Sequence, residues 1–418
     1  MIGVVRDSWS LLLGLLLLML GNGLQGTLLG VRGALEGMTP STLSFVMSAY
    51  FVGLLIGARV TPVMIGRVGH VRVFAALASL ISAAFILYAA FPDPWVWGAT
   101  RLLVGFSFCG VYVVAESWLN ERATNETRGK AMSVYMLVQM IGIVSAQGLL
   151  MLADPGGYAL FALISILVSV AVAPMLLSAG PTPVFRTAKR MTLRDLYRVS
   201  PLGCVGTFLL GGIFSAMFGM AAVYGGEAGL SIGQISALVA AMYTGGLIAQ
   251  WPIGWLSDRM DRRRLIVAIC AVGALAATVA ALADFTGVLI AAAVVGAVAN
   301  PLYSLIIAHT NDYLQSEDMA SASGGLLFLN GVGAVGGPIA VGFLMERFGA
   351  GAYFAYFAVL LAGVALYGLY RMTQRASPVD TAPYAPILAS ATSVAVEIAS
   401  EIAAEASTGD KARAANAV

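Results

Sequence analysis

The sequence predicts an all-α membrane protein with twelve transmembrane helices in two pseudo-symmetric six-helix bundles. Three observations predict this fold class. Of the 418 residues, 59% are hydrophobic and only 11% are charged, whereas about a quarter of the residues of an ordinary soluble domain are charged. The apolar residues form continuous blocks of about twenty residues, the length that a helix needs to cross roughly 30 Å of hydrocarbon. Finally, a segment of the first half of the chain recurs in the second half.

The apolar blocks define the expected helices in chain order. Those of the first half cover residues 11–30, 43–65, 73–91, 95–119, 131–152 and 159–178. Those of the second half cover residues 201–223, 232–256, 265–284, 287–310, 320–345 and 350–371. Each block is continuously apolar, whereas the strands of a membrane β-barrel would alternate apolar and polar residues over about ten positions. The blocks therefore predict helices.

The segments between and after these blocks define the domain organisation. Residues 1–180 and 201–375 form the two bundles, and the polar, basic residues 181–200 form a linker. Residues 376–418, the C-terminal tail, are rich in Pro, Ala, Ser and Thr, which predicts disorder, although residues 384–406 have the spacing of a surface helix.

The distribution of Arg and Lys predicts the orientation of the chain. The loops on one side carry nearly all of these residues, and the loops on the other side hold only Arg32 and Arg347. Because the more basic side of a membrane protein stays in the cytoplasm, we expect both termini to be cytoplasmic. The first block runs on as a full span, so we expect no cleaved signal peptide. A multi-pass protein of the bacterial inner membrane is predicted.

The internal repeat has an offset of 192 residues. Gly53–Ile56 and the later Gly66–Arg72 match Gly245–Ile248 and Asp258–Arg264, at the ends of the second and eighth blocks. A repeat at a fixed offset indicates two related structural units.

The loop after the eighth block resembles the G-x-x-x-D-R-x-G-R-R gating loop of the major facilitator superfamily. It keeps all the motif positions but one, with Asp261 in place of the last glycine; these positions are Gly254, Asp258, Arg259, Arg262 and Arg263. The first copy keeps Arg67, Gly69 and Arg72 but has Gly66 at the aspartate position. In this family the aspartate helps to lock the outward-facing state, so the resemblance implies that the C-terminal copy alone carries the locking charge pair.

Other segments extend this resemblance over residues 1 to about 375. Arg101–Gly105 is similar to an element of the family's fourth helix, and the charged residues Glu126 and Arg128 are similar to the signature that opens its fifth helix. Residues 115–122, 250–254 and 301–304 resemble the uncharacterised bacterial YcaD-like branch. The resemblance implies a transporter that works by alternating access, with a central cavity lined by the first, fourth, seventh and tenth helices.

The fourth block carries polar residues at helical spacing. They are separated by four, four, three, four and four positions, and they are Arg101, Gly105, Cys109, Tyr112, Glu116 and Asn120. This spacing places all six on one face of a helix. Ionisable groups at bilayer depth are costly and usually face a cavity or a partner, so we expect this face to line the cavity.

Glu116 is the first candidate for a proton-binding carboxylate. It lies at bilayer depth, and Arg101 is about four helical turns away, too far to hold it ionised. The alternative is a structural acid that pairs with Arg122 or Arg128, since structural ion pairs also perturb titration.

His309 is a second proton-binding candidate, because histidine titrates near physiological pH. It lies three residues from Asp312, which makes a His309–Asp312 pair feasible. The other polar residues of this block lie on a different face and are substrate candidates; they are Asn300, Tyr303, Ser304 and Asn311. The alternative for His309 is a structural role at the helix end or against the eleventh helix.

Amide side chains supply the remaining substrate candidates. Asn22 and Gln25 lie one turn apart in the first block, and Gln139 lies in the fifth. They would bind a polar substrate or hold helices together. Met217 and Met220 would be soft ligands for copper, but no histidine or cysteine repeats beside them, so metal transport is the weakest alternative.

Together these residues predict a secondary transporter for a small polar or zwitterionic organic solute, coupled to protons. An uncoupled facilitator, or a membrane sensor or assembly factor that keeps the fold, remains an alternative. We expect no enzymatic activity, cofactor, bound metal or nucleic-acid partner, and a functional monomer in the lipid bilayer.

Overall fold

The computed structural model describes residues 8–122, 127–176 and 191–375, together with seven residues of the C-terminal tail. These tail residues are Tyr384, Ile387, Thr392, Val394, Ala395, Ile398 and Ala399. Within the described residues, all regular secondary structure is helical. Eleven helices of this part of the chain are long and apolar enough to cross a membrane, and a shorter apolar helical stretch covers Ala159–Pro174. The predicted set of twelve apolar helical segments is therefore confirmed.

The first six helices lie close to the predicted blocks. They are α2 (Trp9–Leu35), α3 (Pro40–Val68), α4 (His70–Ala90), α5 (Pro94–Arg122), α6 (Arg128–Leu149) and α7 (Ala159–Leu176). Thr39 caps α3, because its hydroxyl accepts a hydrogen bond from the Thr42 backbone N–H at 3.3 Å. Gly69 has a φ of +84° and turns the chain between α3 and α4, a conformation that favours glycine.

The second half begins with a short helix within the predicted linker. The helices are α8 (Leu193–Val199), α9 (Pro201–Gly219), α10 (Ala221–Glu227), α11 (Ile232–Ser257), α12 (Arg262–Ala280), α13 (Phe285–Asn311), α14 (Ser316–Phe348) and α15 (Ala352–Gln374). The predicted seventh span is interrupted near Met220, so α9 and α10 replace one continuous helix.

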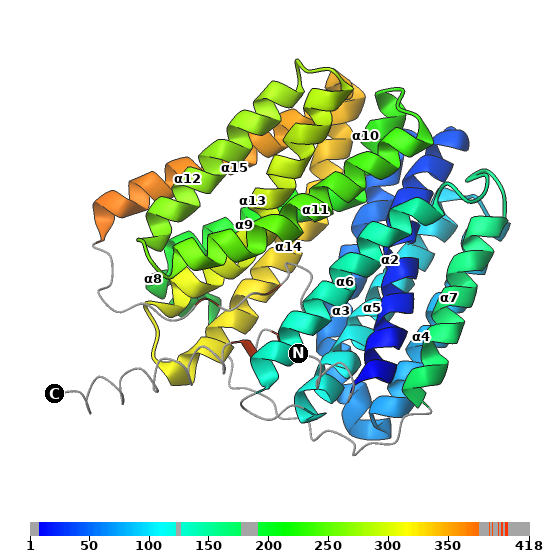
Figure 1. Cartoon of the computed structure of the whole chain (residues 1–418), viewed down its shortest axis with the longest axis horizontal. Coiled ribbons are helices and arrows are strands. Elements are labelled where there is room, and N and C mark those ends of the chain that lie inside the picture. Colours follow the sequence, from blue (N-terminus) through cyan, green and yellow to red (C-terminus); the bar gives the residue numbers. More distant parts are fainter. Residues whose placement is uncertain are drawn as a thin grey trace.

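The packing within the two halves follows the same scheme. In the first half α2 packs on α6 and α7, α3 packs on α5, and α4 packs on α5 and α7. In the second half α9 packs on α14 and α15, α11 packs on α13, and α12 packs on α13 and α15. Figure 1 shows the two bundles side by side, blue to green-cyan and green to orange. The sequence repeat therefore corresponds to a structural repeat.

Glycines allow the two central helix pairs to approach closely. A Cβ on Gly105 of α5 would overlap the Tyr50 carbonyl oxygen of α3. At the repeated position, a Cβ on Gly296 of α13 would overlap the Met242 carbonyl oxygen of α11. Small residues let membrane helices pack backbone against backbone, so these glycines fix α5 and α13 against their neighbours.

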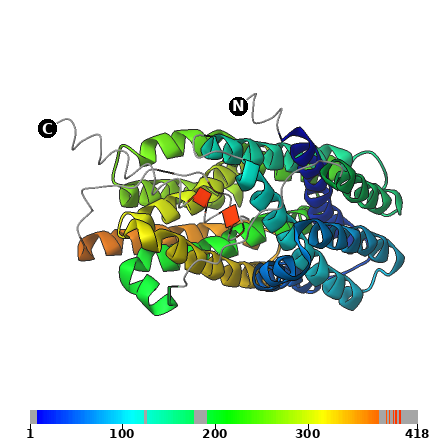
Figure 2. The ribbon, with the colours of Figure 1, turned by 90° about the horizontal axis from the view of Figure 1, so that it is seen from below.

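The two halves touch at the helix ends that the sequence assigns to the outer side. There α3 packs on α14: the Ser41 backbone N–H donates to Glu346 Oε2 at 3.1 Å. The rings of Phe45 and Phe343 meet edge to face at a centroid distance of 5.8 Å. At the opposite ends, predicted to be cytoplasmic, the short red pieces of the tail lie between the halves in both views (Figures 1 and 2).

Candidate functional site

A cavity of about 600 Å³ lies between the two halves. Residues of α2, α3, α5 and α6 line it from the first half, and residues of α9, α11, α13 and α14 line it from the second. Met191 and Leu193, in and beside the linker, also line it. The cavity is therefore shared by both bundles, and it extends toward the predicted cytoplasmic side.

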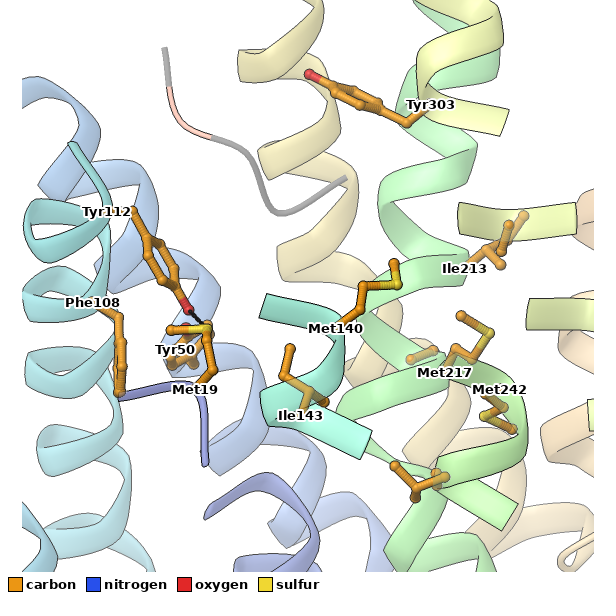
Figure 3. Close-up of a cluster of buried hydrophobic side chains, with 14 of the residues drawn as sticks. Met19, Tyr50, Phe108, Tyr112, Met140, Ile143, Ile213, Met217, Met242 and Tyr303 are labelled. Atoms are coloured by element: carbon orange, nitrogen blue, oxygen red, sulfur yellow. Dashed lines mark hydrogen bonds between the residues drawn. The ribbon is translucent and has the colours of Figure 1, made fainter. Parts of the chain in front are cut away.

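A chain of polar contacts crosses from α5 to α2 at this cavity. Arg101 Nη1 donates to Gln25 Oε1 at 2.8 Å, and Gln25 Nε2 donates to Asn22 Oδ1 at 2.5 Å. Asn22 Nδ2 in turn donates to the Tyr112 hydroxyl at 2.7 Å. The Tyr112 hydroxyl points to Met19 Sδ at 3.7 Å (Figure 3). Four of the predicted substrate residues therefore form one connected group that lines the cavity.

Arg101 is buried in this group, with 5% of its surface exposed. Among the residues that the structure describes, no carboxylate lies within ion-pair distance of it. Its guanidinium lies over the Tyr50 ring at 4.8 Å, and its Nε has no hydrogen-bond acceptor. A buried cation without an anionic partner is electrostatically unfavourable, so this position favours the entry of an anionic group.

Glu116 lies closer to the predicted cytoplasmic end of the same helix and is 1% exposed. The Tyr135 hydroxyl of α6 donates to its Oε1 at 2.7 Å. Two tail groups donate to its Oε2, namely the Thr392 hydroxyl and the Ala395 backbone N–H, the latter at 3.1 Å. Within the described part of the chain Glu116 has no basic partner, and the side chain of Arg122 lies outside it.

The opposite wall of the cavity is aromatic and was not predicted. Phe218 of α9 stacks on Tyr243 of α11 with ring centroids 3.8 Å apart. Phe214 meets Phe218 at 4.7 Å, and Arg59 of α3 lies 5.1 Å from the Phe328 ring centroid. All five side chains line the cavity. Aromatic residues occur in most of the apolar blocks, so only the packing of the helices distinguishes those that meet here.

The polar residues predicted on α13 separate into several environments. Asn300 lines the cavity, and its Nδ2 donates to Gly296 O at 3.0 Å. Ser304 contacts the tail. Tyr303 and Asn311 are buried and lie outside the cavity lining.

The remaining predicted site residues differ in their relation to the cavity. Gln139 lines it, whereas Asn120 is half-buried and lies outside the lining. The His309 ring packs against Tyr313 with centroids 5.3 Å apart. Asp312, the expected partner of His309, forms an ion pair with Arg262.

The two copies of the gating loop have different surroundings. In the second copy Arg262 is buried, donates to Ala308 O at 3.2 Å and to Asp258 at 3.2 Å, and forms the ion pair with Asp312. This network ties the loop between α11 and α12 to the end of α13. Arg263 pairs with Asp261 at 2.8 Å, whereas Arg259 lies over the Trp255 ring. In the first copy the residues at Gly66, Arg67 and Arg72 are exposed and Gly69 is half-buried.

Two further predictions concern charge and metal. Arg128 begins α6, and Glu126 of the same predicted charge network lies outside the described residues. In the part of the chain that is described, no group of three or more His, Cys, Asp or Glu side chains is placed to hold a metal ion. Met217 and Met220 are fully buried in the apolar core.

Two six-helix bundles around a shared cavity define a transporter fold. A model of the Major Facilitator Superfamily matches residues 11–233 and 202–402, and the chain belongs to this superfamily. It is therefore a multi-pass membrane transporter and not an enzyme.

Individual relatives and solved structures agree with this family. An uncharacterized MFS-type transporter of Yersinia pestis is 25% identical over 91% of this chain and 99% of its own. The uncharacterized MFS-type transporter YcaD of Escherichia fergusonii is 26% identical over 82% of this chain and 90% of its own.

A variant of the nucleoside transporter NupG has a TM-score of 0.75 at 13% identity, covering 86% of this chain and 98% of its own. The E. coli fucose:proton symporter FucP has a TM-score of 0.56 at 14% identity, covering 88% and 99%. These two structures establish the likeness of fold alone.

Proposed function

We propose that this transporter moves a small polar or zwitterionic organic solute that carries an anionic group, and that protons drive the transport. The observation that carries the proposal is Arg101, a buried cation that lines the cavity without a carboxylate partner among the described residues. A planar guanidinium binds a carboxylate through two parallel hydrogen bonds. The amides of Asn22 and Gln25 would contact other polar atoms of the solute.

The aromatic wall supports the zwitterionic form of this substrate. Phe218 and Tyr243 face the cavity from the second half. Aromatic faces attract cations and also pack on apolar groups. A solute bound at Arg101 by its carboxylate would then present its other end to this wall, and both bundles would hold it, as alternating access requires.

Glu116 is proposed as the proton-coupling group. It is buried on the same helix as Arg101, and its described partners are neutral donors. A carboxyl in such a place changes its proton occupancy when its solvent exposure changes, which links protonation to the conformational cycle. FucP, which shares this fold, is by name a proton symporter; the likeness makes the mechanism available to the fold and no more.

The substrate proposal is tested by a ligand screen on purified protein. Thermal shift against carboxylates, amino acids, neutral sugars and organic cations should select solutes with a carboxylate. In the Arg101→Gln variant these solutes should bind about ten- to a hundredfold more weakly, because hydrogen bonds to charged groups contribute about 1.5–3 kcal/mol. Met140→Leu, which changes an uncharged cavity residue that is not a substrate candidate, is the matched control. Selection of neutral or cationic solutes, or equal affinity in Arg101→Gln, would contradict the proposal.

Proton coupling is tested in proteoliposomes with the solute that the screen identifies. An imposed pH gradient should change the initial rate of uptake by the wild-type protein. In Glu116→Gln the pH gradient should no longer change the rate, while exchange of solute at equal concentrations should persist. A wild-type rate that is indifferent to the gradient would favour the uncoupled facilitator. Binding of no solute in the screen would favour a sensor or assembly factor.

A further inference from the structure

The tail residues are buried between the two bundles. Thr392, Ala395 and Ile398 are each 2–3% exposed, and Ile387 is 3% exposed. Such burial is unlike that of a solvated polar tail, whose side chains would face water. The described tail residues are therefore part of the folded core at the predicted cytoplasmic side.

On the first half, the described tail residues donate hydrogen bonds to the carboxylate of Glu116. The Thr392 hydroxyl and the Ala395 backbone N–H both donate to its Oε2. Of the three described donors to this carboxylate, only the Tyr135 hydroxyl belongs to the bundle itself. Thr392 also lines the central cavity. The tail thus lies between Glu116 and the predicted cytoplasmic solvent.

On the second half, the tail makes backbone hydrogen bonds. The Ser304 hydroxyl of α13 donates to Ile387 O at 2.7 Å, and the Ile387 backbone N–H donates to the Ser304 hydroxyl oxygen, also at 2.7 Å. The Tyr384 backbone N–H donates to Asp258 Oδ1 at 3.0 Å, and Gln250 Nε2 donates to the Tyr384 hydroxyl at 3.0 Å.

The Tyr384 ring also explains a feature of the gating loop. Gly254 of α11 presents its backbone to this ring, and a Cβ on Gly254 would lie 2.8 Å from ring carbons of Tyr384. Asp258, the loop aspartate, accepts both from the tail and from Arg262. The tail therefore contacts the same loop that the family uses to control conformation.

These tail contacts connect the two halves at the predicted cytoplasmic side, where the halves themselves are separated. A transporter that alternates between two openings must bring α5 toward α11 and α13 on the cytoplasmic side before its outer side can open. With the tail bound to Glu116 on one half and to Ser304, Gln250 and Asp258 on the other, this closure is sterically blocked.

We propose that the tail acts as an autoinhibitory plug through the contacts of its described residues, chiefly Tyr384, Ile387, Thr392 and Ala395, and that it holds the transporter inward-facing and covers Glu116 until it dissociates. This inference does not depend on the identity of the solute or on proton coupling. It predicts that the tail protects the inner cavity from water-soluble reagents, and that its removal accelerates the transport cycle.

Thiol accessibility tests the plug without a known substrate. In a background where Cys109, Cys204 and Cys270 are replaced by alanine, Ser304→Cys reports on the tail side of α13. Ser107→Cys is the matched control, because Ser107 is equally buried on a membrane helix and lies outside the cavity lining. Both variants are made in the full chain and in a chain that ends at residue 383.

The reagent is a membrane-impermeant maleimide, applied to inside-out vesicles. Truncation should accelerate labelling of the Ser304→Cys thiol by about tenfold or more, because protection scales with the docked fraction. The Ser107→Cys rate should not change. A synthetic peptide of residues 384–399 should restore protection of the truncated protein, and a scrambled peptide should not. Equal labelling of full-length and truncated Ser304→Cys, or no effect of the peptide, would overturn the proposal.

Cross-linking checks the docked geometry independently. With Ser304→Cys and Ile387→Cys in the same chain, mild oxidation should form a disulfide, because the two residues share two hydrogen bonds. Ser107→Cys with Ile387→Cys should not cross-link. If the labelling result held but no disulfide formed at 304 and 387, the docking position proposed here would be wrong.

Discussion

Replacing Gly105 by alanine tests the contact that holds the cavity face of α5 against α3. The added Cβ would overlap the carbonyl oxygen of Tyr50, and a backbone atom cannot move aside without moving its helix. The two helices must therefore separate. Forcing an extra carbon into a packed core costs typically 1–3 kcal/mol, and the loss of close backbone packing adds to that cost.

The same helix provides a matched control. Gly98 lies two turns before Gly105 on α5, and no atom lies within 4 Å of the Cβ that alanine would add there. Alanine is favoured over glycine in a helix by up to about 1 kcal/mol. Replacement of glycine by alanine should therefore destabilise the protein at Gly105, and the same replacement at Gly98 should leave its stability unchanged or raise it.

The assay is thermal unfolding of purified protein in detergent, followed by tryptophan fluorescence at one scan rate. For a unit of 150–250 residues, each 1 kcal/mol shifts the midpoint by about 2–4 °C. Gly105→Ala should therefore lower the midpoint by about 2–12 °C, and Gly98→Ala should not lower it. If Gly105→Ala melted at or above the wild-type temperature, the close approach of α3 and α5 would be refuted.

Three further predictions use the same preparations. Gly296→Ala should lower the midpoint as Gly105→Ala does, because the repeated contact on α13 is as close; an unchanged midpoint would break the symmetry of the two halves. Arg262→Met should cost about 3–5 kcal/mol, since it removes one partner of a buried ion pair together with the hydrogen bonds to Ala308 and Asp258, whereas Arg259→Ala at the exposed neighbouring position should stay within about 0.5 kcal/mol. Burial raises the pKa of Tyr384, so docking of the tail is favoured while the Tyr384 hydroxyl is protonated. Docking should therefore be unchanged at any pH below the ordinary tyrosine pKa of about 10. It should weaken only as the pH rises above that value. Protection of the Ser304→Cys thiol should therefore be constant between about pH 7 and 9 after correction for reagent reactivity; loss of protection in that window would contradict this.

The residue pattern along the chain was enough to predict the helices and their pairing into halves. Apolar length is a local property, because each span must satisfy its own backbone hydrogen bonds in the bilayer. The repeat from Gly53 to Gly245 likewise needs no tertiary information. The sequence also singles out Asn22, Gln25, Arg101 and Tyr112 as substrate candidates, since polar side chains in apolar spans are few and helical spacing shows which share a face.

Tertiary structure alone decided which of those residues meet. The residues predicted on and beside α13 are distributed between the cavity, the core and the loop network. Asp312, for example, pairs with Arg262 from α12 rather than with a neighbour on α13. The aromatic wall of Phe218 and Tyr243 depends on the crossing of α9 and α11, which no local pattern encodes.

The tail gives the clearest example of the difference. Its composition predicts disorder, because local sequence carries too little apolar surface to order a segment by itself. The burial of its described residues arises instead from contacts with Glu116 on α5, Ser304 on α13 and Asp258 at the end of α11, all far away in sequence. The sequence by itself determined a membrane transporter of two related halves with a polar face on α5. The packing of those halves decided the shape of the cavity, the partners of Arg101 and Glu116, and the place of the described tail residues, since each depends on contacts between residues on different helices or segments of the chain.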